Sequence, residues 1–156
     1  MLGSASPRRR EILERLGLAF EVRVRETDET LPPEIACTDA AAWLARKKAL
    51  AFADLKDEFL IITADTVVCL EGRSLAKPAD AAEAEEMLNA LSGKSHSVIT
   101  GVCLYHKDDL HVFSEETRVH FRRLPPGVIR HYIDTFRPFD KAGAYGIQAY
   151  GSTLVA

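Results

Sequence analysis

The longest apolar run in the chain, FLIITADTVVCL at residues 59–70, constrains the fold more than any other feature. Its β-branched residues favour a buried strand, and it is too short to cross a bilayer as a helix. Because a buried strand must be covered by other elements, the run predicts a layered domain with this strand in its core.

Helical and extended patterns alternate around this run, which is typical of an α/β or α+β domain. Ser6 and Pro7 mark the beginning of a first helix, and Asp80 with Glu83 resembles a capping box before a later one. The patterns predict helices at 7–16, 39–54, 81–91 and 126–136, and further strands at 19–25, 96–106 and 110–122. With 156 residues, we expect a single domain over 1–156.

The charge balance argues against a protein that coats nucleic acids. Twenty Lys and Arg residues against twenty-three Asp and Glu residues give a formal net charge of -3, whereas non-specific nucleic-acid binding needs a basic excess. A signal peptide would show a basic start followed by an apolar stretch, and the sequence does not show this pattern. We therefore expect a cytoplasmic protein with no membrane partner and no stable nucleic-acid binding.

The first helix begins with Arg8, Arg9 and Arg10, although the N-terminal end of a helix carries about half a positive charge. A bound anion would offset this unfavourable arrangement. The hydroxyls of Ser4 and Ser6, the backbone N–H groups and the arginines together predict a phosphate receptor. A solvated basic helix start on the surface is the alternative.

Two charged residues interrupt apolar patterns. Lys48 falls on the apolar face of the 39–54 helix, where its ammonium must be paired or reach water. Asp65 interrupts the buried run, and a carboxylate there would be neutral unless a cation or metal lies beside it. The alternatives are a lysine that reaches solvent and a simple turn at 63–66.

Three further polar residues are weaker candidates. Pro78 forces Lys77 into an extended conformation, and Glu29 lies in a polar loop. Gln148 lies in the glycine-spaced segment DKAGAYGIQAYG, where its amide could read the edge of a base, although a structural glycine-rich loop is equally consistent. Together, the candidates provide cations, one or two carboxylates, and backbone N–H groups at a helix start. This combination suits the binding of a nucleoside triphosphate with a divalent metal.

The motifs resemble, in order and spacing, those of the Maf family of nucleoside triphosphate pyrophosphatases, also called septum-formation inhibitor proteins. The resemblance covers nearly the whole chain and is carried by GSASPRRREIL, the Asp28-Glu29 pair, LARKKAL, ADTVV, LAKPADAAEAEEMLNALSGKSHSVITGV and DKAGAYGIQAYG. It implies hydrolysis of a nucleoside triphosphate to the monophosphate and pyrophosphate, with Asp65 as the catalytic acid–base residue. Arg8, Thr66 and Gln148 match the branch of the family that acts on dTTP and UTP.

The resemblance also implies which residues line the site. Glu29 and Asp65 would hold a divalent metal cation, Mg²⁺ or Mn²⁺. The substrate-binding residues would be Ser4, Ser6, Arg8, Arg9, Lys48, Thr66, Lys77 and Gln148.

The fold that the resemblance implies is an α/β domain with an elongated mixed β-sheet flanked by helices, two lobes around a central cleft, and a homodimer. We expect this chain to lack the C-terminal segment of the family, because it stops at Ala156. The alternative to an enzyme is a catalytically silent nucleotide-binding or cell-division interaction protein.

Overall fold

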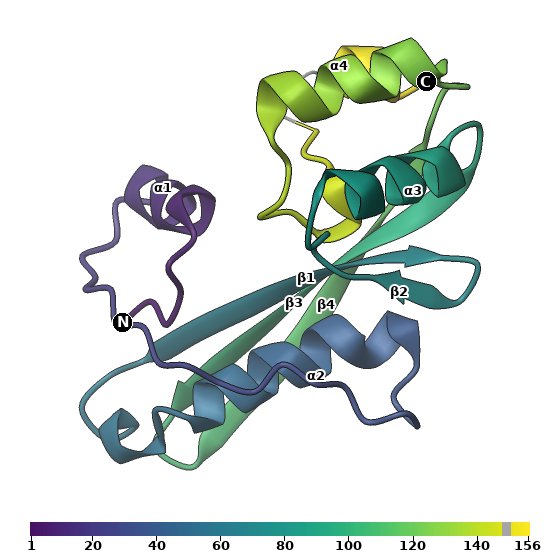
Figure 1. The fold of residues 1–156 in the computed structure, drawn as a ribbon. Helices are drawn as coiled ribbons and strands as arrows, with labels where there is room; N and C mark the ends of the chain where they lie inside the picture. The colour runs from purple at the N-terminus through teal and green to yellow at the C-terminus, as the bar shows by residue number, and fades with distance from the viewer. Residues whose placement is uncertain (148–150) are drawn as a thin grey trace. The chain divides into compact units, whose positions relative to one another are not determined.

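The computed structural model describes residues 1–147 and 151–156, in which helices and strands alternate along the chain (Figure 1). The elements are, in chain order, α1 (Pro7–Arg15), α2 (Cys37–Leu50), η1 (Ala53–Leu55), β1 (Ile61–Leu70), β2 (Arg73–Leu75), α3 (Ala81–Leu91), β3 (Ser95–His106), β4 (Asp109–His120), α4 (Pro126–Phe136), η2 (Ala142–Ala144) and α5 (Gly151–Leu154).

The four strands form one sheet in the order β2-β1-β3-β4. β1 and β2 are antiparallel, with Val68 opposite Leu75. Parallel bridges join Leu2 to Val22 and to Ile62. The α/β class, with a β-sheet flanked by helices, is therefore confirmed, and the parallel pairings are isolated bridges of Leu2, which lies outside the four strands of the sheet.

The chain divides into two compact units, and β1, β3 and β4 contribute residues to both. Unit 1 comprises Met1–Asp65 and Thr100–Glu115, and unit 2 comprises Thr66–Ile99 and Glu116–Ala156.

Unit 1 is built around close packing of α2 on the sheet. A Cβ atom added to Gly101 would lie 2.3 Å from the carbonyl carbon and oxygen of Ala41, so only glycine allows β3 to approach the helix this closely. Thr63 of β1 is fully buried and donates a hydrogen bond to the Ala45 carbonyl oxygen of α2 at 2.7 Å. The core of unit 1 consists of Met1, Ala45, Ala49, Phe52, Ile61, Cys103 and Tyr105.

In unit 2, α3 packs against α4, and the two helices lie side by side in Figure 1. The capping pattern expected for α3 is confirmed, because Asp80 accepts a hydrogen bond from the Glu83 amide at 2.9 Å. Glu83 in turn accepts from the Ala79 amide at 2.7 Å. Buried aromatic and aliphatic side chains from α3, α4, β1 and the chain after α4 form the core of this unit.

The sequence patterns did not predict β2 or the short helices η1, η2 and α5, and two of the expected elements differ clearly from the observed ones. The strand expected at 19–25 is reduced to the single bridge at Val22. The helix expected at 39–54 runs from Cys37 to Leu50, and its N-cap is Ala36. It ends early because the Phe52 amide bonds to Ala49, which tightens the turn and leaves the Phe52 ring buried in the core of unit 1.

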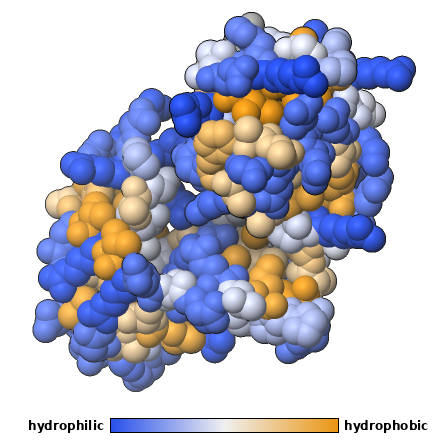
Figure 2. Space-filling view, in the orientation of Figure 1, coloured by the Kyte–Doolittle hydropathy of each residue, from blue (hydrophilic) through white to orange (hydrophobic). Residues whose placement is uncertain are grey.

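Hydrophilic side chains predominate on the face shown in Figure 2. Among the helices of the described residues, none combines the length and the apolar character that a bilayer crossing requires.

Candidate functional site

Lys48 connects two carboxylates within unit 1. Its ammonium nitrogen lies 2.8 Å from Glu29 Oε1 and also pairs with Asp65 Oδ1. The side chains of Lys48 and Asp65 keep only 18% and 13% of their surface exposed, whereas that of Glu29 is about half exposed, at 51%. Three segments distant in sequence, the loop at Glu29, helix α2 and strand β1, therefore converge on one charged cluster.

Local structure explains why Lys48 faces Asp65. Lys48 follows Ala41, Leu44 and Ala45 on the face of α2 that packs against the sheet, which confirms the position predicted from periodicity. The bond from Thr63 to α2 lies two residues before Asp65 in the same strand. The helix and the strand are thus held together where the two charges meet.

The electrostatics of the cluster keep Lys48 protonated. Burial lowers the pKa of the Lys48 ammonium, but the hydrogen bonds to Asp65 and Glu29 outweigh that effect, and the pKa is raised overall. Removing either carboxylate would leave the half-buried Lys48 ammonium with less favourable interaction to offset the cost of its removal from water.

Arg9 links the N-terminal segment to the strand that carries Asp65. Its Nη1 donates to the Ala64 carbonyl oxygen at 2.7 Å and to Ser4 Oγ at 3.2 Å. Ser4 Oγ also accepts from the Ser6 amide at 3.3 Å. Burial lowers the pKa of Arg9, and the nearby charge of Asp65 opposes that change. The structure therefore places Ser4 and Arg9 beside the Lys48 cluster.

The start of α1 keeps features expected of an anion-accepting helix end. Ser6 is the N-cap residue, as predicted, but its side chain makes no capping hydrogen bond. The first turn of α1, Pro7–Arg10, contains no acidic residue, and Arg8 is exposed on it. No carboxylate within this turn therefore offsets the positive end of the helix dipole.

The remaining predicted residues lie elsewhere in the chain. Thr66 is a half-buried residue of β1 and the first residue of unit 2. Lys77 is exposed in unit 2, between β2 and α3. Gln148 lies outside the described residues. Their roles at the site stay predictions.

The carboxylates of the cluster fit a divalent cation that is shared with phosphate. Glu29 and Asp65 present oxygen atoms to a single positive group, the Lys48 ammonium. Within the described part of the chain, no cluster of three or more His, Cys, Asp or Glu side chains could hold a metal ion. Two carboxylates match the way Mg²⁺ is usually held, since it completes its coordination with phosphate oxygens and water.

Two positioning residues were missed by the sequence analysis. Thr63 and Gly101 carry no charge themselves, but they fix β1 and β3 against the helix that carries Lys48. Signals for both exist in the sequence. A threonine within a buried strand needs an internal hydrogen-bond acceptor, and a glycine inside a strand often marks a close backbone approach.

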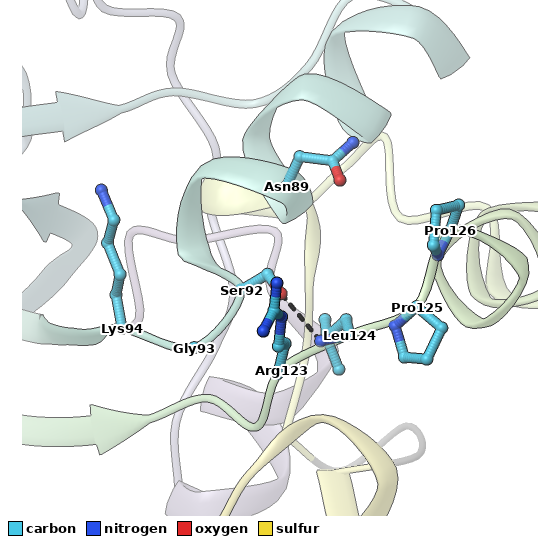
Figure 3. A pocket seen from close by; sticks show the side chains of 8 residues that line it. All are labelled: Asn89, Ser92, Gly93, Lys94, Arg123, Leu124, Pro125 and Pro126. Carbon is cyan, nitrogen blue, oxygen red and sulfur yellow. Dashed lines mark hydrogen bonds between the residues drawn. The ribbon is translucent and has the colours of Figure 1, made fainter.

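A separate hollow lies in unit 2 between the end of α3 and the start of α4 (Figure 3). At its base the Leu124 amide donates to Ser92 Oγ at 2.7 Å. Lys94, at its side, pairs with Glu71. None of the site residues predicted from the sequence lines it. The lining residues are Asn89, Ser92, Gly93, Lys94, Arg123, Leu124, Pro125 and Pro126.

Comparisons with known proteins agree on one family. A family model described as Maf-like protein matches residues 1–156. A dTTP/UTP pyrophosphatase of Bacillus cytotoxicus is 46% identical over 155 residues, which cover 99% of this chain and 81% of the relative. A dTTP/UTP pyrophosphatase of Bacillus thuringiensis is 44% identical over 155 residues, with the same coverage of 99% and 81%.

A solved structure supports the fold. The structure of a HAM1 protein from Coxiella burnetii matches with a TM-score of 0.50 and 18% sequence identity, and the match covers 80% of this chain and 73% of that chain. At this identity the likeness concerns the arrangement of helices and strands alone.

Proposed function

The chain belongs to the family of Maf-like proteins, and from that premise we propose that it is a nucleoside triphosphate pyrophosphatase that converts dTTP and UTP to the monophosphate and pyrophosphate. Relatives 46% and 44% identical over nearly the whole chain carry the name of that activity. The structural observation that carries the proposal is the convergence of Glu29, Lys48 and Asp65 in unit 1.

In the proposed mechanism, Asp65 orients or deprotonates the water that attacks the α-phosphate, with pyrophosphate leaving in line. Glu29 and Asp65 would hold the divalent cation, Mg²⁺ or Mn²⁺. When bound, this cation would neutralise charge on the phosphate oxygens. Lys48 supplies positive charge as charge builds on the phosphates, and each such group contributes roughly 2.7–4 kcal/mol in a water-poor site.

The phosphate chain is proposed to bind at the start of α1. Ser4, Ser6, Arg8 and Arg9 surround this helix end, and its positive dipole favours an anion. Because Arg9 is also bonded to the Ala64 carbonyl oxygen next to Asp65, it connects phosphate binding to the catalytic carboxylate. Lys77 is also proposed to bind the substrate.

Base selection is proposed to depend on Arg8, Thr66 and Gln148. A side-chain amide has both a donor and an acceptor, so Gln148 can complement the N3–H and O4 edge of uracil or thymine. The Gln148→Glu variant should lose this preference. Equal relative rates for wild type and variant across a panel of nucleoside triphosphates would contradict the assignment.

The decisive test compares Asp65→Asn with wild type, using dTTP or UTP, Mg²⁺ and a pyrophosphate readout. We expect pyrophosphate release to be almost abolished in Asp65→Asn and unchanged in the control Asp57→Asn, because Asp57 is an exposed carboxylate of the same unit. Release by Asp65→Asn near the wild-type rate would reject the mechanism. Tight UTP binding by wild type without monophosphate formation would instead favour a silent nucleotide-binding protein.

We also propose a cytoplasmic location, as expected from the sequence, and a homodimer, as the family resemblance implies. Large apolar side chains exposed in the N-terminal part of unit 1, including Ile12, Leu16 and Val24, are consistent with a protein interface. Light scattering after size-exclusion chromatography tests the dimer, and a monomeric mass at micromolar concentration would exclude it.

A further inference from the structure

We propose that Lys48 is a built-in counter-ion, which occupies the cation position between Glu29 and Asp65 in the free protein and leaves it when nucleotide and metal bind together. This inference rests on the proposed function, since it concerns the same two carboxylates, which pair with Lys48 in one state and bind the metal in the other. In the second state, the Lys48 ammonium pairs with the phosphates of the nucleotide.

The geometry of the cluster carries the inference. One ammonium contacts both carboxylates at hydrogen-bonding distance, so it stands where a cation bound by both would stand. Two positive groups cannot share the same pair of oxygen atoms, because they repel and overlap. The ammonium must therefore move away from at least one carboxylate before both can ligate a metal.

The surroundings of Lys48 allow such a movement. Its side chain is a flexible four-carbon stem that ends in a compact charge. It is half-buried rather than enclosed, with 18% of its side-chain surface exposed, and Glu29 on its outer side is 51% exposed. A triphosphate bound near the start of α1 would offer the ammonium new anionic partners to replace the carboxylates.

The exchange has a thermodynamic consequence. In the free protein the metal competes with Lys48 for Glu29 and Asp65, so the affinity for metal alone is low. A nucleotide that accepts the ammonium removes this competition. Metal and nucleotide therefore bind with positive coupling, each raising the affinity for the other by the same factor.

The test measures the binding of Mn²⁺ alone, by calorimetry or electron paramagnetic resonance, with no nucleotide present. Lys48→Met keeps much of the length of the side chain and removes its charge. We expect this variant to bind Mn²⁺ at least roughly 10- to 100-fold more tightly than wild type, because the loss of even one of the two competing charge-assisted hydrogen bonds has an effect of this size.

Lys47→Met is the matched control. Lys47 is the preceding residue of α2, but its ammonium pairs with Asp28 at 3.4 Å and lies 4.8 Å from the Trp43 ring centroid. This variant removes the same charge from the same helix turn. The non-specific electrostatic effect on Mn²⁺ binding is therefore the same in Lys47→Met as in Lys48→Met. Equal Mn²⁺ affinities for Lys48→Met and Lys47→Met would overturn the proposal.

A measurement on wild type covers the case in which Lys48→Met does not fold. Acylation of lysines followed by peptide mass spectrometry should show that saturating Mn²⁺ speeds the labelling of Lys48 several-fold and leaves that of Lys47 unchanged. Unchanged labelling of Lys48 would overturn the exchange. Neither readout depends on nucleotide hydrolysis, whereas the proposed pyrophosphatase activity is tested by pyrophosphate release. Failure of the exchange is therefore distinguishable from failure of the proposed activity.

Discussion

Replacing Gly101 by alanine tests the packing that brings Lys48 to Asp65. The added Cβ would lie 2.3 Å from the carbonyl carbon and oxygen of Ala41 and 2.4 Å from the amide nitrogen of Ala42. Carbon atoms in contact are normally about 3.5–4.0 Å apart, so α2 must move by roughly 1 Å. The obstructing atoms belong to the backbone of α2, and no change of rotamer can relieve the overlap.

Two effects should follow from this displacement. Overpacking of this kind costs about 1–3 kcal/mol in the free energy of unfolding, and in a chain of this size each kcal/mol lowers Tm by roughly 2–4 °C. Because α2 carries Lys48, a displacement of about 1 Å should also reduce kcat/KM on the order of 100-fold. Thermal unfolding by circular dichroism and the pyrophosphate assay measure the two effects separately.

Gly127→Ala is the matched control. Nothing lies within 4 Å of the Cβ that this change would add in α4, so Tm should stay constant or rise slightly. A second variant sharpens the test: adding Ala41→Gly to Gly101→Ala should not restore stability, because the overlap is with the main chain. If Gly101→Ala unfolds within about 0.5 kcal/mol of wild type and keeps full activity, the argument for close packing of α2 on β3 is refuted.

Three further predictions concern stability. Burial lowers the pKa of His96 to about 4. As pH falls, the unfolded chain therefore takes up a proton on His96 before the folded chain does. The contribution of neutral His96 to the free energy of unfolding, about 3 kcal/mol, should be lost as pH falls from about 6.5 to 4. Urea unfolding across this range should show a flatter pH dependence for His96→Gln but not for the exposed His111→Gln, and identical slopes would contradict the burial argument. Asp80→Ala removes the cap of α3 and should cost about 0.5–2 kcal/mol by urea unfolding, whereas no loss would mean that the cap contributes nothing. Thr63→Val removes a buried hydrogen bond to α2 and should cost about 1–3 kcal/mol in the same assay, because the carbonyl of Ala45 loses its side-chain donor; an unchanged midpoint would refute this.

Elements whose signals are local could be predicted from the sequence. The helices expected at 81–91 and 126–136 have those bounds in the structure, because periodicity and capping residues act within a few positions. The same reasoning placed Lys48 on the packed face of its helix and Asp65 inside a buried strand. Both residues could be identified as candidate site residues because a charge in an apolar pattern requires a partner.

The partners of these charges depend on contacts between segments that are distant in the sequence. Glu29 lies in a polar loop without a distinguishing pattern, yet it pairs with Lys48. Arg9 was expected to bind phosphate, and in the structure its guanidinium also bonds to the Ala64 carbonyl oxygen, 55 positions away in the chain. Local patterns carry no information on such distances, because these contacts form only when α1, α2 and β1 are packed together.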